Sequence, residues 1–190
     1  MAGEERLREL LAQHPVETAR ELLGWELLRT LPEGELVVCR LVETEAYHES
    51  EPGCHAHRGI TERNRAMFLR PGHAYIYFVY GVHHCLNVVC GEEGEGAAVL
   101  VRAAAPVSPA NLRLTGPGVL CRTLGINQEL YACDLLNPTS PLRLRRAKLH
   151  QDESIAVSPR IGLSPSQSPE LPWRFFIEGN QYVSNRPGKR

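Results

Sequence analysis

The sequence predicts an α+β fold: a single domain over residues 1–190 with a mostly antiparallel, curved sheet, a protruding β-hairpin and surrounding helices. Three observations support this prediction. Strand-like apolar runs dominate the middle of the chain, helical periodicity is confined to the N-terminus and a few short segments, and turn residues separate consecutive runs. A chain of 190 residues can bury a substantial core.

The N-terminal segment predicts two helices. Leu7, Leu10 and Leu11 form one helical stripe, and Pro15 suits the first turn of a second helix, which Gly24 ends. The further elements expected are strands over 25–31 and 35–45, a polar loop over 48–60, a short helix from Thr61 to Phe68, a hairpin over 75–90, a strand over 97–104, helical turns around 109–114 and 117–124, a loop over 164–172 and a strand over 173–177.

The hairpin is the most informative segment. Residues 75–81 hold three of the six tyrosines, and alternating side chains point to opposite faces of a strand. Gly81 permits a positive φ before the second apolar run, which puts Tyr80 next to the tip. A tip aromatic suits insertion between bases. The alternative is an ordinary aromatic core strand.

Charge is unevenly distributed. The net charge is −1, but residues 1–51 carry 12 Asp/Glu against 5 Arg, whereas residues 101–148 carry 7 Arg/Lys against 2 Asp/Glu. A nearly neutral chain can therefore still present a basic face to phosphates.

Composition also bounds location and assembly. No apolar run approaches the ~20 residues that span a membrane, and the polar N-terminus lacks secretory features. We therefore expect an intracellular, cytoplasmic protein. A monomer is also expected, and the family resemblance given below implies that the protein is nucleoid-associated. The six cysteines have no regular framework and are expected to be reduced, mostly buried thiols.

Several polar residues fall within strand-like runs. Glu43 and Glu45 share one strand face, which Tyr47 continues, although a solvated acidic face gives the same pattern. Arg102 is either a strand-end surface charge or the buried partner of a carboxylate such as Glu45. Asn87 either faces solvent or lines a pocket.

Metal and cofactor signals are weak. Cys54, His55 and His57 cluster in one loop, and residues 83–85 form a second His/Cys group, but neither has the ligand spacing of a zinc site. No nucleophile elbow, dinucleotide fingerprint or phosphate-binding glycine loop is present. We expect no metal and no cofactor.

Several segments together resemble the alkyladenine (3-methyladenine) DNA glycosylase family, in the same order from about residue 15 to 185. Cys54 and Glu62 depart from that family's usual residues without touching the chemistry. The matching segments are VETEAY at 42–47, HAHRG at 55–59, RNRAMF at 63–68, PGHAYIYFVYG at 71–81, CLNVV at 85–89, LTGPG at 114–118 and GIN at 125–127, with the strand that ends in Arg102.

The resemblance implies a monofunctional DNA N-glycosylase that acts on damaged double-stranded DNA. It would flip alkylated or deaminated purines, such as 3-methyladenine, hypoxanthine or ethenoadenine, and release them by water attack, starting base excision repair. The implied roles are Glu45 as the water-activating base, Arg102 as the residue that orders the water, Tyr47, His55 and Tyr77 as the base pocket, Asn87 as a filter against guanine, Tyr80 as the intercalating wedge and Ile161 as part of a site-closing segment.

Three cations complete the candidate site. Arg58, Arg63 and Arg65 are candidates for contacts with the DNA backbone. Two other functions stay open from sequence: a non-catalytic nucleic-acid-binding domain that uses the same tyrosines, and a metal-dependent hydrolase built on Cys54, His55 and His57.

Overall fold

One antiparallel sheet organises the computed structural model, which describes residues 2–184. The helices are α1 (Ala2–Leu11), α2 (Pro15–Glu21) and α3 (Pro117–Thr123), with the 3₁₀ helices η1 (Arg65–Phe68), η2 (Gln128–Leu130) and η3 (Pro165–Gln167). The strands are β1 (Glu26–Thr30), β2 (Leu36–His48), β3 (Ala74–Val79), β4 (His83–Val89), β5 (Ala97–Ser108), β6 (Leu142–Arg145), β7 (Ile155–Ser158) and β8 (Arg174–Ile177).

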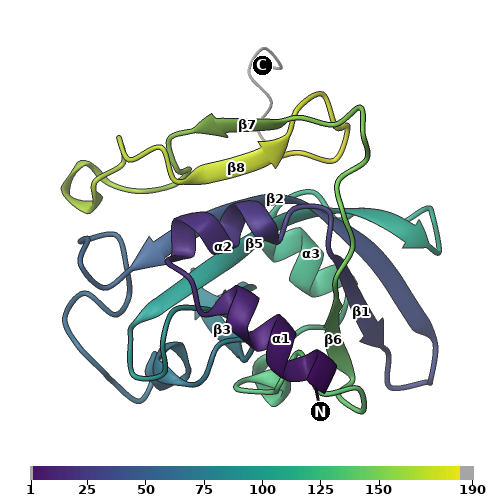
Figure 1. Ribbon diagram of the computed structural model, residues 1–190, viewed down its shortest axis with the longest axis horizontal. Coiled ribbons are helices and arrows are strands. Elements are labelled where there is room, and N and C mark those ends of the chain that lie inside the picture. Colours follow the sequence, from purple (N-terminus) through teal and green to yellow (C-terminus); the bar gives the residue numbers. More distant parts are fainter. Residues whose placement is uncertain (1, 185–190) are drawn as a thin grey trace.

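Strand β2 is the centre of this sheet. The strand order is β3-β4-β5-β2-β1-β6, while β8 pairs with the later part of β2 and β7 pairs with β8. Every strand pair in the described residues is antiparallel. The long strands β2 and β5 run together across the molecule, and the β7–β8 hairpin lies along one edge of the view (Figure 1). The expected α+β class with a mostly antiparallel sheet and a hairpin is confirmed.

Helix α2 covers one face of β2. His14 caps the helix through Nδ1, which accepts from the backbone N–H of Val16 at 3.4 Å, and Pro15 occupies the first turn. The Thr44 hydroxyl donates to the carbonyl of Ala19 at 2.8 Å, so Thr44 faces α2. Alternation along the strand turns Glu43 and Glu45 to the opposite face.

Two predicted helical segments differ in the structure. The short helix expected from Thr61 to Phe68 forms only in its second half, as η1, although the Thr61 hydroxyl accepts from the Asn64 N–H at 3.3 Å. The first half is a turn, because the Asn64 side chain accepts from the Thr61 N–H at 2.6 Å and donates to the Gly59 carbonyl at 3.0 Å. Residues 109–114 form a bend and a turn but no helix, and the end of this segment lies beside β5, where the Ala104 N–H donates to the Leu114 carbonyl at 3.1 Å. Strands β6 and β7 were not predicted.

Burial of the cysteines agrees with the sequence-based expectation. Five of the six are buried, Cys133 is half-buried, and all six are free thiols. No helix within residues 2–184 combines the length and apolar character needed to cross a bilayer.

The tip of the β3–β4 hairpin projects Tyr80 away from the core. Tyr80 and Gly81 have φ values of 54° and 68°, the sign that a type I′ hairpin turn requires. The Val82 N–H closes the turn on the Val79 carbonyl at 3.2 Å. The Tyr80 side chain is 85% exposed, whereas Tyr75 on the same hairpin is 1% exposed. The hairpin is therefore core at its base and free at its tip.

We predict that Tyr80→Asn stabilises the fold. A non-glycine residue at positive φ costs roughly 1 kcal/mol, and asparagine tolerates this conformation best after glycine. Relief of that strain should raise Tm by about 2–4 °C in a chain of this size. Thermal unfolding measures this change in Tm. Tyr80→Val is the matched variant, and it should lower Tm because a β-branched residue tolerates positive φ poorly. A fall with asparagine as large as that with valine would show that the tyrosine ring packs on the fold.

Candidate active site

An aromatic cavity of about 490 Å³ opens between the hairpin, the start of α3 and the segment after β7. Four tyrosines line it: Tyr47 from β2, Tyr75 and Tyr77 from β3, and Tyr80 from the hairpin tip. Asn87, from β4, and Arg102, from β5, also line it. The cavity is large enough for one drug-sized or base-sized ligand.

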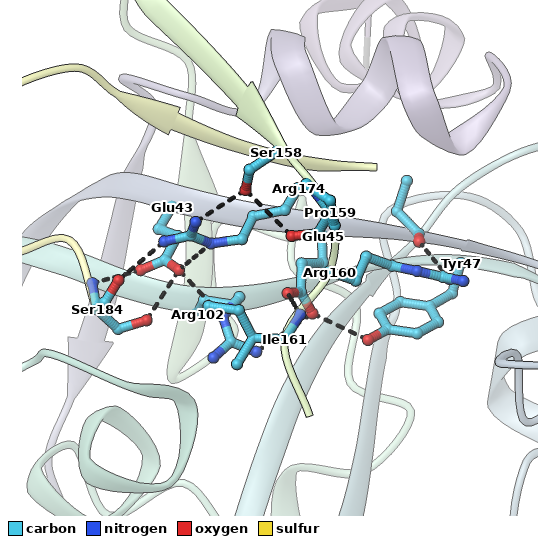
Figure 2. A network of polar contacts seen from close by, with 11 residues as sticks. Glu43, Glu45, Tyr47, Arg102, Ser158, Pro159, Arg160, Ile161, Arg174 and Ser184 are labelled. Carbon is cyan, nitrogen blue, oxygen red and sulfur yellow. Dashed lines mark hydrogen bonds and ion pairs between the residues drawn. The ribbon is translucent and has the colours of Figure 1, made fainter. Parts of the chain in front are cut away.

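Glu45 lies immediately behind the cavity wall. Its carboxylate accepts from the Tyr47 hydroxyl at 2.9 Å, from Nη1 of Arg102 at 3.2 Å and from the backbone N–H of Ile161 at 2.8 Å (Figure 2). These three donors line the cavity, whereas Glu45 itself is 0% exposed. The structure therefore brings together four of the sequence-predicted site residues: Glu45, Tyr47, Arg102 and Ile161.

The alternative of a solvated acidic face is wrong. Glu43 is also 0% exposed, and it accepts from Nε of Arg102 at 3.1 Å and from Nε of Arg174 at 2.7 Å. Ser184 donates to it through its backbone N–H at 2.6 Å and its hydroxyl at 2.8 Å. Two buried carboxylates thus face two buried guanidiniums, an arrangement that avoids an uncompensated buried charge.

Arg102 is a buried partner of carboxylates, not a surface charge. Its side chain is 9% exposed and forms ion pairs with both Glu43 and Glu45. Burial alone would lower the pKa of Arg102, but the carboxylates of Glu45 and Glu43 raise it above the ordinary value. The guanidinium therefore supplies a permanent positive charge at the cavity wall.

The tyrosine hydroxyls stay protonated. Burial first, and then the Glu45 carboxylate, raise the pKa of Tyr47 well above its ordinary value. Burial likewise raises the pKa of Tyr75 and of Tyr77. Tyr47 is therefore a hydrogen-bond donor to Glu45 at any physiological pH.

His55 lies at the mouth of the cavity with its ring partly exposed. Nδ1 shares a hydrogen bond of 2.8 Å with the Tyr75 hydroxyl, and the ring meets the Tyr77 ring edge-on at 4.6 Å between centroids. Partial burial, and then the positive charge of Arg63, lower the pKa of His55 below 6.5. The imidazole is neutral at neutral pH and is available as a hydrogen-bonding wall of the cavity.

Asn87 lines the cavity and does not face solvent. It is 3% exposed, and its Nδ2 donates to the Tyr75 carbonyl at 3.1 Å. That bond fixes the side chain against the neighbouring strand and presents a rigid polar group to a ligand.

Arg160 supports the cavity from behind Tyr47, and the sequence did not predict it as such. Its guanidinium pairs with the buried Glu51 at 2.7 and 2.8 Å and lies 4.7 Å from the centre of the Tyr47 ring. It also approaches the Trp173 ring at 5.4 Å. The same segment places the Ile161 N–H on Glu45, so Arg160 anchors both the ring and the backbone that surround the carboxylate.

Sequence reasoning also missed Arg174 and Ser184. Arg174 carried a usable signal, because it is a lone cation within the apolar strand 173–177, the same pattern that singled out Arg102. Nothing in the sequence around Ser184 or Glu51 indicates that these residues bind buried charges.

The arginines proposed for DNA contact are exposed, and one of them, Arg63, lies beside another site residue. Arg63 donates to the Phe78 carbonyl at 3.3 Å and lies 5.8 Å from the centre of the Tyr77 ring. Arg65 pairs with the exposed Glu62 at 3.2 Å, a contact of small energy. Arg58 is exposed in the loop after His57.

The residues of the candidate metal cluster turn to separate partners. Cys54 Sγ is buried against the Gly96 carbonyl at 3.7 Å, and Nδ1 of His57 bonds to the Glu49 carbonyl at 2.9 Å. Among the described residues, no group of three His, Cys, Asp or Glu side chains is arranged to hold a metal ion. Cys54, His55 and His57 therefore do not converge on one point.

The amino-acid sequence matches the profile of a known protein family. The profile described as Methylpurine-DNA glycosylase (MPG) matches residues 9–181. The chain belongs to this family. It is therefore a DNA glycosylase, a hydrolase that acts on N-glycosyl bonds.

Bacterial relatives agree with this membership. A protein of Herpetosiphon aurantiacus is 41% identical, over 93% of this chain and 86% of its own length. A protein of Carboxydothermus hydrogenoformans is 39% identical, over 94% and 98%, and one of Chlorobaculum parvum is 42% identical, over 89% and 85%. All three are provisionally named as 3-methyladenine DNA glycosylases.

We predict that Arg63 holds His55 in its neutral form. In an NMR titration, the His55 imidazole should be half-protonated below pH 6.5, because both its surroundings and Arg63 disfavour the imidazolium. Arg63→Gln removes a positive charge and should move the midpoint upward. Arg65→Gln makes the same chemical change at a residue paired with Glu62 and should leave the midpoint in place. Equal midpoints in all three proteins would refute the role of Arg63.

Proposed function

We propose that this DNA glycosylase extrudes alkylated or deaminated purines from duplex DNA and hydrolyses their N-glycosidic bond, with Glu45 as the water-activating base. The observation that carries the proposal is the buried Glu45 carboxylate, held by Arg102 and Tyr47 immediately behind the wall of an aromatic cavity. A carboxylate so held, next to a base-sized space, suits general-base catalysis.

The cavity wall supports a purine substrate. Tyr47 and Tyr77 offer aromatic faces and edges, and alkylated purines are cationic or electron-poor, which favours contact with such rings. The names of the bacterial relatives point to the same class. Hypoxanthine and ethenoadenine are purines of comparable size, and we include them among the substrates. Asn87 is proposed to disfavour guanine, whose extra amino group would meet its fixed side chain.

The proposed reaction needs one water and one base. The water oxygen bonds to C1′ of the sugar and gives its proton to Glu45, while the C1′–N9 electron pair leaves with the base. That electron pair neutralises a cationic alkylated purine, so such a base leaves without an added proton. For such a base one carboxylate suffices, in contrast to the paired carboxylates of most sugar hydrolases. A neutral base such as hypoxanthine must also take up a proton as it leaves.

Water has to reach Glu45 through its three donors. A carboxylate offers about four acceptor positions, and Tyr47, Arg102 and Ile161 occupy three of them. Because the residue is 0% exposed, the mechanism includes a small displacement of one donor as the base enters. Ile161 contacts Glu45 through a single backbone N–H, and this is the contact that we expect to open and close.

Tyr80 is proposed to fill the gap left by the extruded base. Its exposed ring at the hairpin tip is free to stack between neighbouring base pairs. Arg58, Arg63 and Arg65 are proposed to bind phosphates near the hairpin, and a monomer is sufficient for this contact. A non-catalytic binding domain could use the same tyrosines, but it would gain nothing from two buried carboxylates, whose desolvation is costly.

Glu45→Gln should abolish most of the chemistry while retaining lesion binding. The amide cannot take a proton from water, so base release from a duplex with one hypoxanthine should fall by about 10²-fold or more. Single-turnover rates measure the chemistry, and a fluorescence binding assay on the same duplex is the control. Near-normal release would exclude Glu45 as the base.

Tyr80→Asn should impair extrusion although it stabilises the fold. Without an aromatic ring, the stacking contact, worth roughly 1–3 kcal/mol per base in comparable contacts, is lost. A fluorescent base analogue beside the lesion reports extrusion. Tyr80→Trp, which keeps a flat ring at the tip, is the matched control and should extrude normally. If both variants extrude like the unaltered protein, Tyr80 is not the wedge.

The enzyme should leave the abasic strand uncut. Strand cleavage through a Schiff base requires a nucleophilic amine, and the chain has two lysines. Lys148 is exposed and precedes Leu149 on the side of α2, away from the cavity, and Lys189 lies outside the described residues. Borohydride treatment during turnover should trap no protein–DNA adduct. A covalent adduct on lesion DNA would overturn this expectation.

A further inference from the structure

A second fully buried carboxylate, Glu43, lies two residues from the proposed base. We infer that Glu43 is a positioning residue that, completed by Arg174 and Ser184, fixes the Arg102 guanidinium against Glu45. This inference rests on the proposed role of Glu45.

Neighbouring strands on both sides of β2 supply the partners of Glu43. Arg102 comes from β5 and Arg174 from β8, the two strands that flank β2 at this point. Arg174 lies directly opposite Glu45 in the register, yet its Nε bonds to Glu43 at 2.7 Å (Figure 2). Glu43 therefore collects the charged groups of three strands.

Two carboxylates on the same strand face fix the orientation of Arg102. Its Nε donates to Glu43 at 3.1 Å, and its Nη1 donates to Glu45 at 3.2 Å. A planar guanidinium held at two of its nitrogens cannot rotate. Within the described part of the chain, Nη2 has no protein acceptor, and Arg102 lines the cavity. Glu43 thereby leaves one oriented donor for a water or a ligand.

Glu43 itself has no room to activate water. One of its oxygens accepts from Arg102, Arg174 and the Ser184 hydroxyl, and the other accepts from the Ser184 N–H. Four donors therefore surround this carboxylate, three of them on one oxygen. Glu43 is also fully buried and absent from the cavity wall. Glu43 can therefore position neighbouring side chains but cannot reach a substrate in the cavity.

Charge balance gives the inference a measurable signature. With Glu43, Glu45, Arg102 and Arg174 ionised, the four charges cancel. Loss of the Glu43 charge leaves the set at +1, which favours ionised Glu45, whereas loss of the Arg174 charge leaves it at −1, which disfavours it. The titratable or charged groups facing Glu45 are Glu43 and Tyr47 of β2, Tyr77 of β3, Cys85 of β4, Arg102 of β5, Arg160 after β7 and Arg174 of β8.

The test compares Glu43→Gln and Arg174→Gln by single-turnover base release from a hypoxanthine duplex across pH. We expect Glu43→Gln to slow release by up to about 10²-fold through misplacement of Arg102, with unchanged duplex affinity. The acidic limb of the pH–rate profile should move to lower pH in Glu43→Gln and to higher pH in Arg174→Gln. Opposite shifts would not follow from a general loss of stability.

Glu153→Gln is the matched control. Glu153 forms a paired contact with Arg40 of β2 at 2.7 and 2.6 Å, and Arg40 is five residues along the strand from Glu45. This variant breaks a comparable ion pair away from the cavity. It should keep the unaltered rate and the unaltered acidic limb.

Ser184→Ala keeps all four charges and decides the matter if the charge variants do not fold. Loss of its hydroxyl donor should slow release several-fold, and Ser184→Thr should restore the rate. The inference is overturned if Ser184→Ala has the unaltered rate, or if the two limbs shift in the same direction. It is also overturned if Glu43→Gln is inactive while Glu45→Gln is active. If the unaltered protein and Glu153→Gln release no base, the proposed function itself fails.

Discussion

The structure depends on the neutralisation of two carboxylates that β2 carries into the interior. Glu43 and Glu45 have no exposed surface, and a buried carboxylate without a partner is among the costliest groups a fold can contain. The partners come from both sides: Arg102 from β5, Arg174 from β8 and the backbone of Ile161 and Ser184. The pairing of β2 with β5 and β8 at this point brings these partners together. The candidate site and the sheet topology thus share one electrostatic requirement.

A second buried ion pair supports the wall of the aromatic cavity from behind. Arg160 forms a buried ion pair with Glu51 and lies against the Tyr47 ring, while the next residue donates to Glu45. Tyr47 is therefore fixed on its hydroxyl by Glu45 and on its ring by Arg160. Such supporting contacts hold a wall at a constant position, which matters because small displacements of reacting groups are costly in rate.

Local patterns predicted the strands better than they predicted exposure. Period-2 alternation correctly placed Glu43, Glu45 and Tyr47 on one face, but the same pattern describes a solvated or a buried face, and the choice depends on Arg102 and Arg174 from other strands. The helix predicted from Thr61 starts only at Arg65 because the Asn64 side chain competes for backbone groups, an effect that propensity alone does not reveal. Residues that the family resemblance singled out, such as Glu45, Tyr47 and Arg102, lie together beside one cavity, whereas Ser184 and Glu51 had no local signal.

The short tip of the β3–β4 hairpin, residues 80–82, has a consequence for the proposed association with DNA. Tyr80 and Gly81 both have positive φ, and a backbone hydrogen bond closes the turn. So short and closed a loop has little conformational freedom left to lose. The backbone around Tyr80 therefore loses its conformational entropy when the chain folds, and little is left to lose on binding. In the proposed role of Tyr80, the hairpin tip would meet DNA with its backbone already fixed, and the binding free energy would remain available for distorting the double helix.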